Sequence, residues 1–137
     1  MMRRLFILLA ASTGALAAPA LADEPSRGER QLAEILEGRV AGEPVRCLHE
    51  SQRHAVQIVD WTAIVFRDGD TLWVNRPGGA RMLSSGDLPV FHQYGTRICR
   101  LDRVELRDRL GGVPGPVVIL DEFVPYARVG GDDNEEE

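Results

Sequence analysis

The chain has 137 residues, a formal net charge of −5 and only two cysteines. This length accommodates one domain with a modest core. The basic residues are all arginines, are outnumbered by the acids and form no basic stripe, so the composition excludes a nucleic-acid partner held by charge.

The first 22 residues have the pattern of a secretory signal peptide. Arg3 and Arg4 precede the apolar run 5–11, and small residues lead to Ala20-Leu21-Ala22. A positive start, a short apolar stretch and an A-x-A-like site together indicate export. The apolar run is too short to span a bilayer. We therefore expect cleavage after Ala22 and a periplasmic or secreted mature chain without a membrane span. The paired arginines leave ordinary and twin-arginine export both open.

A helix is predicted at the start of the mature chain. Ser26 and Glu29 have the spacing of a capping box, in which a hydroxyl and a carboxylate satisfy the free N–H groups of the first turn. Leu32 and Leu36 then fall on one helical face, and Gly38 can end the helix in the left-handed conformation. The pattern predicts a helix over about 27–37.

Short runs of β type follow Pro44. Asp68-Gly69 marks a hairpin, because both residues tolerate the positive φ of a tight turn, although two- and three-residue loops both fit. The strands beside this turn are apolar on both faces, which indicates a sheet covered on two sides. The alternation slips between Leu101 and Val104, as at a bulge or bend. The predicted strands cover residues 45–49, 55–59, 62–66, 71–74, 97–107 and 116–124.

Two segments do not have the pattern of regular structure. Residues 77–96 are interrupted by glycine, proline and serine, and so long a segment is usually functional or contains a short helix. Residues 130–137 carry five acids and predict a disordered acidic tail. The single β-rich domain is accordingly expected over 23–129.

Six strands and one leading helix predict a mainly β, α+β fold. We expect a small antiparallel sheet, curled or barrel-like, with the helix packed on it. After export, Cys47 and Cys99 are expected to form a disulfide between the first and fifth strands. A redox pair or a thiolate metal site is the alternative, and the lack of C-x-x-C spacing disfavours both.

Several motifs of the β region occur together in one order. They are Arg46-Cys47, Ile58-Val59-Asp60-Trp61-Thr62, Trp73-Val74-Asn75-Arg76, Cys99-Arg100-Leu101-Asp102 and Asp121-Glu122-Phe123-Val124-Pro125-Tyr126. In this order they resemble a family of small exported proteobacterial proteins of unknown function, over roughly residues 44–126. Many members of that family carry a further cysteine near the last strand, where this chain has Val117-Val118-Ile119. The resemblance implies a periplasmic or secreted β-rich domain and supplies no catalytic residues.

The histidines are weak candidates for metal ligands. His49, His54 and His92 could bind a metal together with Glu50 or Asp60. Their spacing, however, matches no tight ligand motif, and three histidines are an ordinary number for this length. We therefore expect no metal and no cofactor.

Catalytic groups are equally weakly indicated. Ser84, Asp87 and His92 could assemble into a nucleophilic triad, but no G-x-S-x-G elbow surrounds the serine. Four carboxylates near apolar strand residues could serve as an acid and base on a glycan. The alternative is that Asp60 caps a turn and that the others pair with nearby arginines. The four carboxylates are Asp60, Asp102, Asp121 and Glu122, and the arginines are Arg100 and Arg103.

The aromatic residues suggest a contact surface. Trp61, Trp73 and Tyr126 are further candidates for lining a groove, and Trp73 is better explained as core. Phe91 and Tyr94 lie in the irregular segment beside His92, where an exposed contact patch is expected.

The sequence thus favours an exported, non-catalytic binding module that contacts an envelope protein or polymer through residues 77–96. A small hydrolase acting on an envelope polymer and a metal-binding periplasmic protein are the alternatives. The oligomeric state stays open.

Overall fold

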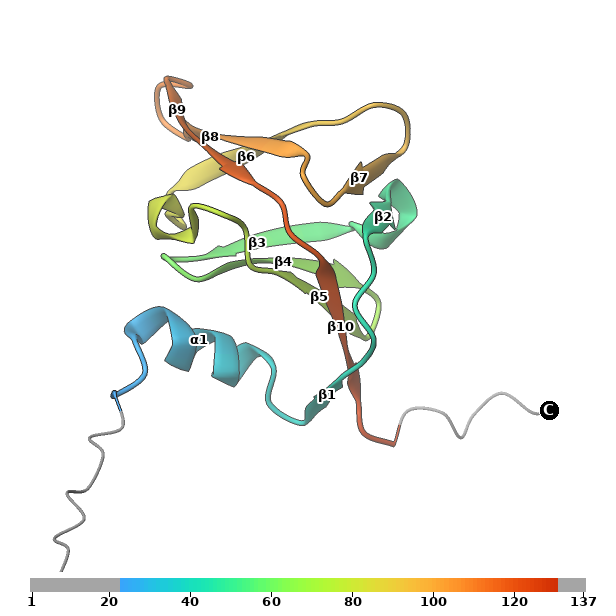
Figure 1. Ribbon diagram of the computed structural model, residues 1–137. Coiled ribbons are helices and arrows are strands. Elements are labelled where there is room, and N and C mark those ends of the chain that lie inside the picture. The colour runs from blue at the N-terminus through green and yellow to red at the C-terminus, as the bar shows by residue number, and fades with distance from the viewer. Residues whose placement is uncertain (1–22, 131–137) are drawn as a thin grey trace, which may run out of the picture.

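The computed structural model describes residues 23–130 (Figure 1). The predicted signal peptide, and the acidic tail apart from Gly130, lie outside the described residues. The described chain is mainly β, as expected, with one α-helix, ten strands and two short 3-10 helices. The elements are α1 (Arg27–Ile35), β1 (Arg39–Ala41), β2 (Cys47–His49), η1 (Glu50–Gln52), β3 (Ala55–Val59), β4 (Ala63–Asp68), β5 (Thr71–Asn75), η2 (Ala80–Met82), β6 (Asp87–His92), β7 (Arg97–Cys99), β8 (Arg103–Asp108), β9 (Pro114–Ile119) and β10 (Phe123–Arg128).

The helix begins where the capping pattern predicts. Ser26 is the N-cap, and its hydroxyl oxygen accepts a hydrogen bond from the Glu29 N–H at 3.2 Å. The helix ends at Ile35, two residues before the predicted end. Gly38 has a φ of +72° and the Arg39 N–H donates to the Leu36 carbonyl, so the chain turns here into β1. The β1 strand was not predicted, because three residues are too few to show an alternation.

A five-stranded antiparallel sheet forms the middle layer, in the order β1-β10-β5-β4-β3. Side chains alternate along β4, so that Ala63 and Val65 face α1 while Ile64 and Phe66 face the opposite layer. Both faces are covered, which confirms the prediction from the apolar hairpin. We call the apolar cluster under the helix the helix-side core; it contains Leu32, Val59, Ala63, Val65, Leu72 and Val74.

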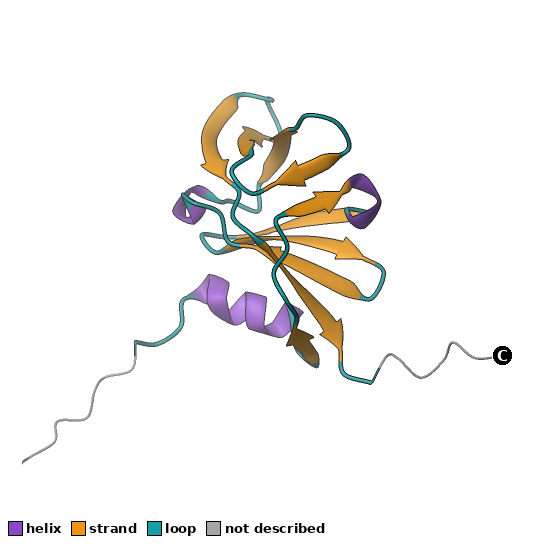
Figure 2. Ribbon diagram, turned by 45° about the vertical axis from the view of Figure 1, so that its right-hand side comes forward, coloured by secondary structure: helices purple, strands orange, loops and turns teal. Residues whose placement is uncertain are grey.

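The second layer consists of two smaller antiparallel sheets, β6-β8-β9 and β2-β7. Figures 1 and 2 show these strands on one side of the five-stranded sheet and the helix on the other. The larger hydrophobic core lies between the two strand layers and includes Leu48, Phe66, Val104, Leu106 and Phe123. The fold is therefore three-layered, with a core on each face of the middle sheet.

The prediction of about six strands in one curled or barrel-like sheet was wrong in count and arrangement. The predicted strand 97–107 is divided into β7 and β8 by a turn, at the place where the alternation slips. The predicted strand 116–124 is likewise divided into β9 and β10, which belong to different layers. Each bend contains one leucine and two charged residues, Arg100 and Asp102 at the first and Asp121 and Glu122 at the second. So short a polar interruption also fits a single strand with one exposed face, so the sequence pattern does not separate the two cases.

Residues 77–96 are more regular than predicted. They contain η2, the expected short helix, and also the strand β6, which was missed. Pro89 lies within β6, and a proline is tolerated there because β6 is an edge strand of its sheet. Pro89, one of the residues that suggested a loop, therefore lies in the edge strand of a sheet.

The predicted hairpin forms with a two-residue loop. Asp68 pairs with Thr71, which leaves Gly69 and Asp70 as the loop, and Gly69 has a φ of +54°. The positive φ explains why glycine occupies this position.

Cys47 and Cys99 form the predicted disulfide. They lie directly opposite each other in the β2–β7 pair. A disulfide is consistent with an oxidising, exported location. Within residues 23–130, no helix has both the length and the hydrophobicity that crossing a membrane requires.

Candidate functional site

The turn between β7 and β8 has an unusual backbone. A hydrogen bond of 3.0 Å from the Asp102 N–H to the Cys99 carbonyl closes it. Leu101, the third residue of this turn, has a φ of +77°. A positive φ at this position strongly favours glycine, yet the chain places there a leucine whose side chain is 62% exposed.

Four contacts hold this turn in place. The Asp102 carboxylate accepts a hydrogen bond from the Cys99 N–H at 2.7 Å, and Cys99 is tied to Cys47 by the disulfide. The Arg100 N–H donates to the Arg46 carbonyl, just before β2. The Leu101 N–H donates to the Leu120 carbonyl at 2.8 Å. Because the surroundings determine the backbone so fully, the strained conformation persists and the Leu101 side chain is held outward.

Leu101 lines a groove of about 480 Å³, which we call the His92 groove. Its apolar part consists of Leu101, Val117 and Tyr94, and Tyr94 is 98% exposed. The complete lining is His92, Tyr94, Leu101, Asp102, Arg103, Glu105 and Val117. Exposed apolar side chains beside charged groups are typical of the surface of a protein interface.

Glu105 is the electrostatic centre of the groove. Its carboxylate accepts from the Arg107 Nε at 2.9 Å and lies 3.3 Å from the His92 Nε2. The hydrogen bond from Arg107, followed by that from His92, lowers the pKa of Glu105. Glu105 is therefore ionised at neutral pH. Arg103 makes no ion pair with any described residue, so its charge is available to a ligand.

The predicted contact patch of Phe91, His92 and Tyr94 is divided between two environments. His92 and Tyr94 line the His92 groove, whereas the Phe91 ring packs 5.6 Å from the Phe66 ring in the core. Side chains alternate along β6, so Phe91 and His92 point to opposite faces. Leu101 was missed as a site residue, although the slipped alternation next to it was the available signal.

The three histidines do not come together. His49 caps η1, His54 lies 3.9 Å from Asp68, and His92 pairs with Glu105. Residues 23–130 contain no group of three or more histidine, cysteine or acidic side chains that could hold a metal ion. Each histidine has a local structural role instead.

The structure also separates the predicted triad. Asp87 and His92 lie at opposite ends of β6, which places them about 17 Å apart along the strand. The Ser84 hydroxyl accepts a hydrogen bond from the nearby Gly86 N–H at 3.3 Å. The predicted serine and histidine of this triad are therefore not within reach of each other.

The carboxylates mostly hold the fold together. Asp60 accepts a hydrogen bond from the Ser85 N–H at 2.5 Å, and Asp102 closes the β7–β8 turn. Asp121 pairs with Arg100 at 3.1 Å, as expected from the alternative in which the carboxylates pair with nearby arginines. The hydrogen bond from the Glu122 N–H and the pair with Arg100 lower the pKa of Asp121, whereas a general acid needs a raised one.

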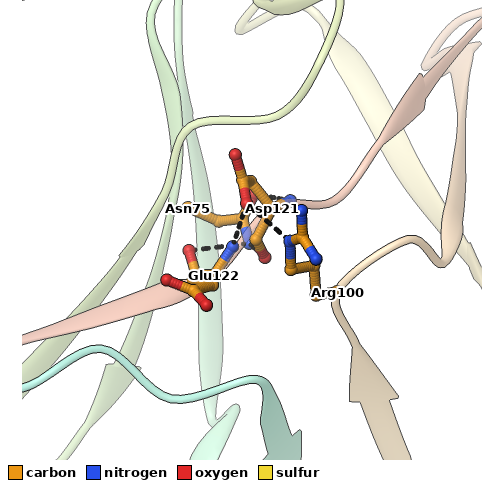
Figure 3. A network of polar contacts seen from close by, with 4 residues as sticks. All are labelled: Asn75, Arg100, Asp121 and Glu122. Carbon is orange, nitrogen blue, oxygen red and sulfur yellow. Dashed lines mark hydrogen bonds and ion pairs between the residues drawn. The ribbon is translucent and has the colours of Figure 1, made fainter.

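Figure 3 shows why polar groups gather around Asp121. The chain crosses here from β9 to β10, and its backbone leaves both sheets. The buried Asn75 amide donates to the carbonyls of Asp121 and Glu122 at 2.6 and 3.3 Å and accepts from the Asp121 N–H at 3.1 Å. Asn75 thereby satisfies backbone groups that would otherwise lack partners.

The other predicted aromatic residues have separate locations. Trp73 packs against the core between the strand layers, as expected, and Tyr126 packs against the helix-side core. Trp61 is 71% exposed, with a φ of +57°, in the turn between β3 and β4. No second apolar residue joins Trp61 in a groove among the described pockets, so it stands apart from the His92 groove.

Comparisons of the chain with protein-family models, curated proteins and solved structures find no match.

Proposed function

We propose that the protein is an exported, non-catalytic binding module and that the His92 groove contacts a protein partner. The resemblance to small exported proteobacterial proteins and the signal-peptide pattern support the exported location, and the disulfide is consistent with it. The envelope is where we expect the partner.

One observation carries this proposal: an exposed leucine is held at a positive φ, beside the disulfide, at the edge of the groove. Leu101 is 62% exposed and so gains little from burial within this chain, and its backbone conformation is unfavourable. Strained backbone that is fixed by its surroundings is concentrated at functional sites. An apolar side chain of a partner, covering Leu101 and Val117, would bury the surface that this turn exposes.

The charges of the groove favour a polypeptide over an apolar ligand. Arg103 can pair with a carboxylate, and the remaining lone pairs of Glu105 can accept hydrogen bonds. Tyr94 supplies a large amphipathic surface of the kind that protein interfaces use. Apolar contact flanked by both charge signs suits a protein segment.

Site-specific photo-crosslinking in the cell envelope tests this proposal. A photoreactive phenylalanine analogue replaces Tyr94 in one variant and Leu110 in another. Tyr94 and Leu110 are both 98% exposed, but Leu110 lies beyond Asp108, the end of β8 that is about 17 Å along the strand from Arg103 of the groove. We expect a discrete adduct with a protein from position 94 and none from position 110.

The chemical nature of the adduct decides the outcome. Mass spectrometry identifies the crosslinked partner, and adding Leu101→Gly should reduce the yield at position 94 several-fold. Equal adducts from both positions, or no adduct from position 94, would contradict the proposed contact surface. An adduct with a glycan and no protein would replace the protein partner with an envelope polymer.

A further inference from the structure

Three arginines lie on one face at one end of the five-stranded sheet. Arg39 of β1 and Arg128 of β10 are directly opposite each other in the register. Both lie two residues from the Ala41–Tyr126 pair, and Tyr126 packs against the helix-side core, so both arginines face the helix side. We call Arg39, Arg67 and Arg128 the arginine cluster.

Arg67 belongs to the same face. It is directly opposite Leu72, which is part of the helix-side core, and Leu72 is in turn opposite Tyr126. Opposite residues of neighbouring strands point to the same side of the sheet. Arg67 is therefore two strands from β10, about 10 Å across the sheet.

The arginine cluster has little opposing charge within the described residues. Among residues 23–130, the only carboxylate within 4.0 Å of any of its guanidinium groups is that of Asp70, which lies 4.0 Å from Arg128 and is 93% exposed. Arg39 donates to the carbonyls of Asp70 and Tyr126 instead of pairing with an acid. Burial lowers the pKa of Arg39, and repulsion from Arg128 and Arg67 lowers it further.

A like-charge pair placed directly opposite in a sheet is unfavourable. The pair of half-buried Arg39 and exposed Arg128 therefore calls for a nearby anion. The chain itself supplies one a few residues further on. Beyond the described residues, it continues with a segment of five acids among six residues: Asp132, Asp133, Glu135, Glu136 and Glu137.

We propose that the arginine cluster is the binding site of the acidic segment 132–137 of the same chain. Seven residues after Gly130 reach at most about 24 Å, which covers the whole cluster. The short tether gives the acids a high effective concentration at the arginines. Bidentate pairing of guanidinium with carboxylate matches the chemistry of both partners. This inference is independent of the proposed contact through the His92 groove.

The test compares the native protein with a variant in which the tail is neutral but equally long. The substitutions are Asp132→Asn, Asp133→Asn, Glu135→Gln, Glu136→Gln and Glu137→Gln. All five positions follow the last described strand, which ends at Arg128, so we expect the fold to be unaffected. The arginine Nε–Hε signals are recorded in ¹H–¹⁵N spectra at low salt. We expect the signals of Arg39, Arg67 and Arg128 to shift between the two proteins, and this difference to disappear at high salt.

Two exposed arginines without ion pairs among the described residues, Arg81 and Arg109, provide the matched control. Their signals should not change. Unchanged signals of the arginine cluster, or equal shifts at the control positions, would overturn the proposal. The shifts should also be the same after tenfold dilution, because the contact lies within one chain. A dependence on concentration would assign the contact to a second copy and overturn the proposal as stated.

Discussion

At the third position of the β7–β8 turn, Leu101 combines a φ of +77° with an exposed side chain. The left-handed conformation brings Cβ too close to the neighbouring carbonyl oxygen and costs about 1–2 kcal/mol for a residue other than glycine. Because Leu101 is mostly exposed, burial of its side chain offsets little of this cost. The residue therefore contributes more to the surface of the protein than to its stability.

The backbone strain at Leu101 should appear as a difference in stability between its alanine and glycine variants. Alanine keeps the Cβ that causes it, whereas glycine removes the Cβ but adds freedom to the unfolded chain. We expect Leu101→Gly to be more stable than Leu101→Ala by about 1 kcal/mol, although glycine usually destabilises relative to alanine. Urea unfolding of both variants, followed by tryptophan fluorescence, measures this difference.

The same pair of substitutions at a residue with an ordinary φ is the control. Leu88 is exposed, lies within β6 and is absent from the positive-φ residues. There alanine should be the more stable of the two. If alanine is also the more stable at position 101, Leu101 does not carry the backbone strain that we assign to it.

At the scale of elements, α1 is attached to the sheet by apolar packing and by one ion pair. Leu32 is buried in the helix-side core. The two oxygens of Glu29 pair with the guanidinium group of Arg76, just after β5, at 2.6 and 3.0 Å. A nine-residue helix is marginal alone, so its stability depends on these contacts.

The Glu29–Arg76 pair should make the attachment of α1 dependent on pH. The hydrogen bond that Glu29 accepts from Arg76 lowers the pKa of Glu29 below the ordinary value of 4.5. The stabilisation is therefore present above about pH 4.5 and is lost as the pH falls through the lowered pKa. Because both side chains are about half exposed, we expect Glu29→Gln to cost only about 0.5 kcal/mol at pH 7 and less at pH 3.

Urea unfolding of the native protein and of Glu29→Gln at the two pH values measures this effect. Glu34→Gln is a suitable comparison, because Glu34 belongs to the same helix and forms no ion pair among the described residues. A difference between Glu29→Gln and the native protein that stays constant from pH 7 to pH 3 would rule out the ion pair as its source.

At the scale of the whole molecule, the disulfide joins two strands that are distant in sequence. Cys47 and Cys99 are separated by 52 positions, and the chain between them contains β3, β4 and β5 of the middle sheet and β6 of the second layer. Closing a loop of this length restricts the unfolded chain and contributes about 4 kcal/mol in the chain-entropy model. That is a large share of the stability of a small domain.

Replacing both cysteines with serine should therefore lower the free energy of unfolding by about 2–4 kcal/mol. Denaturant unfolding of the double variant and of the native protein, each with and without a reducing agent, measures the loss. The reducing agent should destabilise the native protein and leave the double variant unchanged. Equal stability of the oxidised native protein and the double variant would contradict this role of the disulfide.

The predictive power of the sequence differed between parts of the molecule. The start of α1 at Ser26 and the tight turn at Gly69 were found because each depends on side chains only a few residues apart. The disulfide was found because Cys47 had only one other cysteine to pair with. A bulge or bend was expected between Leu101 and Val104, but not that it separates two sheets, and the break at Asp121 and Glu122 was missed. Two or three polar residues in a row also occur within a single strand, so the pattern did not show a change of sheet.

The candidate site was only partly predictable. His92 and Tyr94 were identified from their place in a segment rich in turn residues. Phe91 was assigned to the same patch, because the strand β6 and its alternating faces were not recognised. Leu101 was not singled out, since a single leucine in a predicted strand is usually part of the core. The signal peptide remains a prediction from the pattern of its residues.

The amino-acid pattern alone determined the class of the fold, the helix start, the hairpin and the pairing of the cysteines. These features depend on capping groups, turn residues and periodicity, which are short-range properties of the chain. The tertiary structure alone decided which sheet each strand joins, that Leu101 is exposed, and that three distant arginines share one face. Those features depend on the register and layering of strands, which are set by contacts between residues far apart in the sequence.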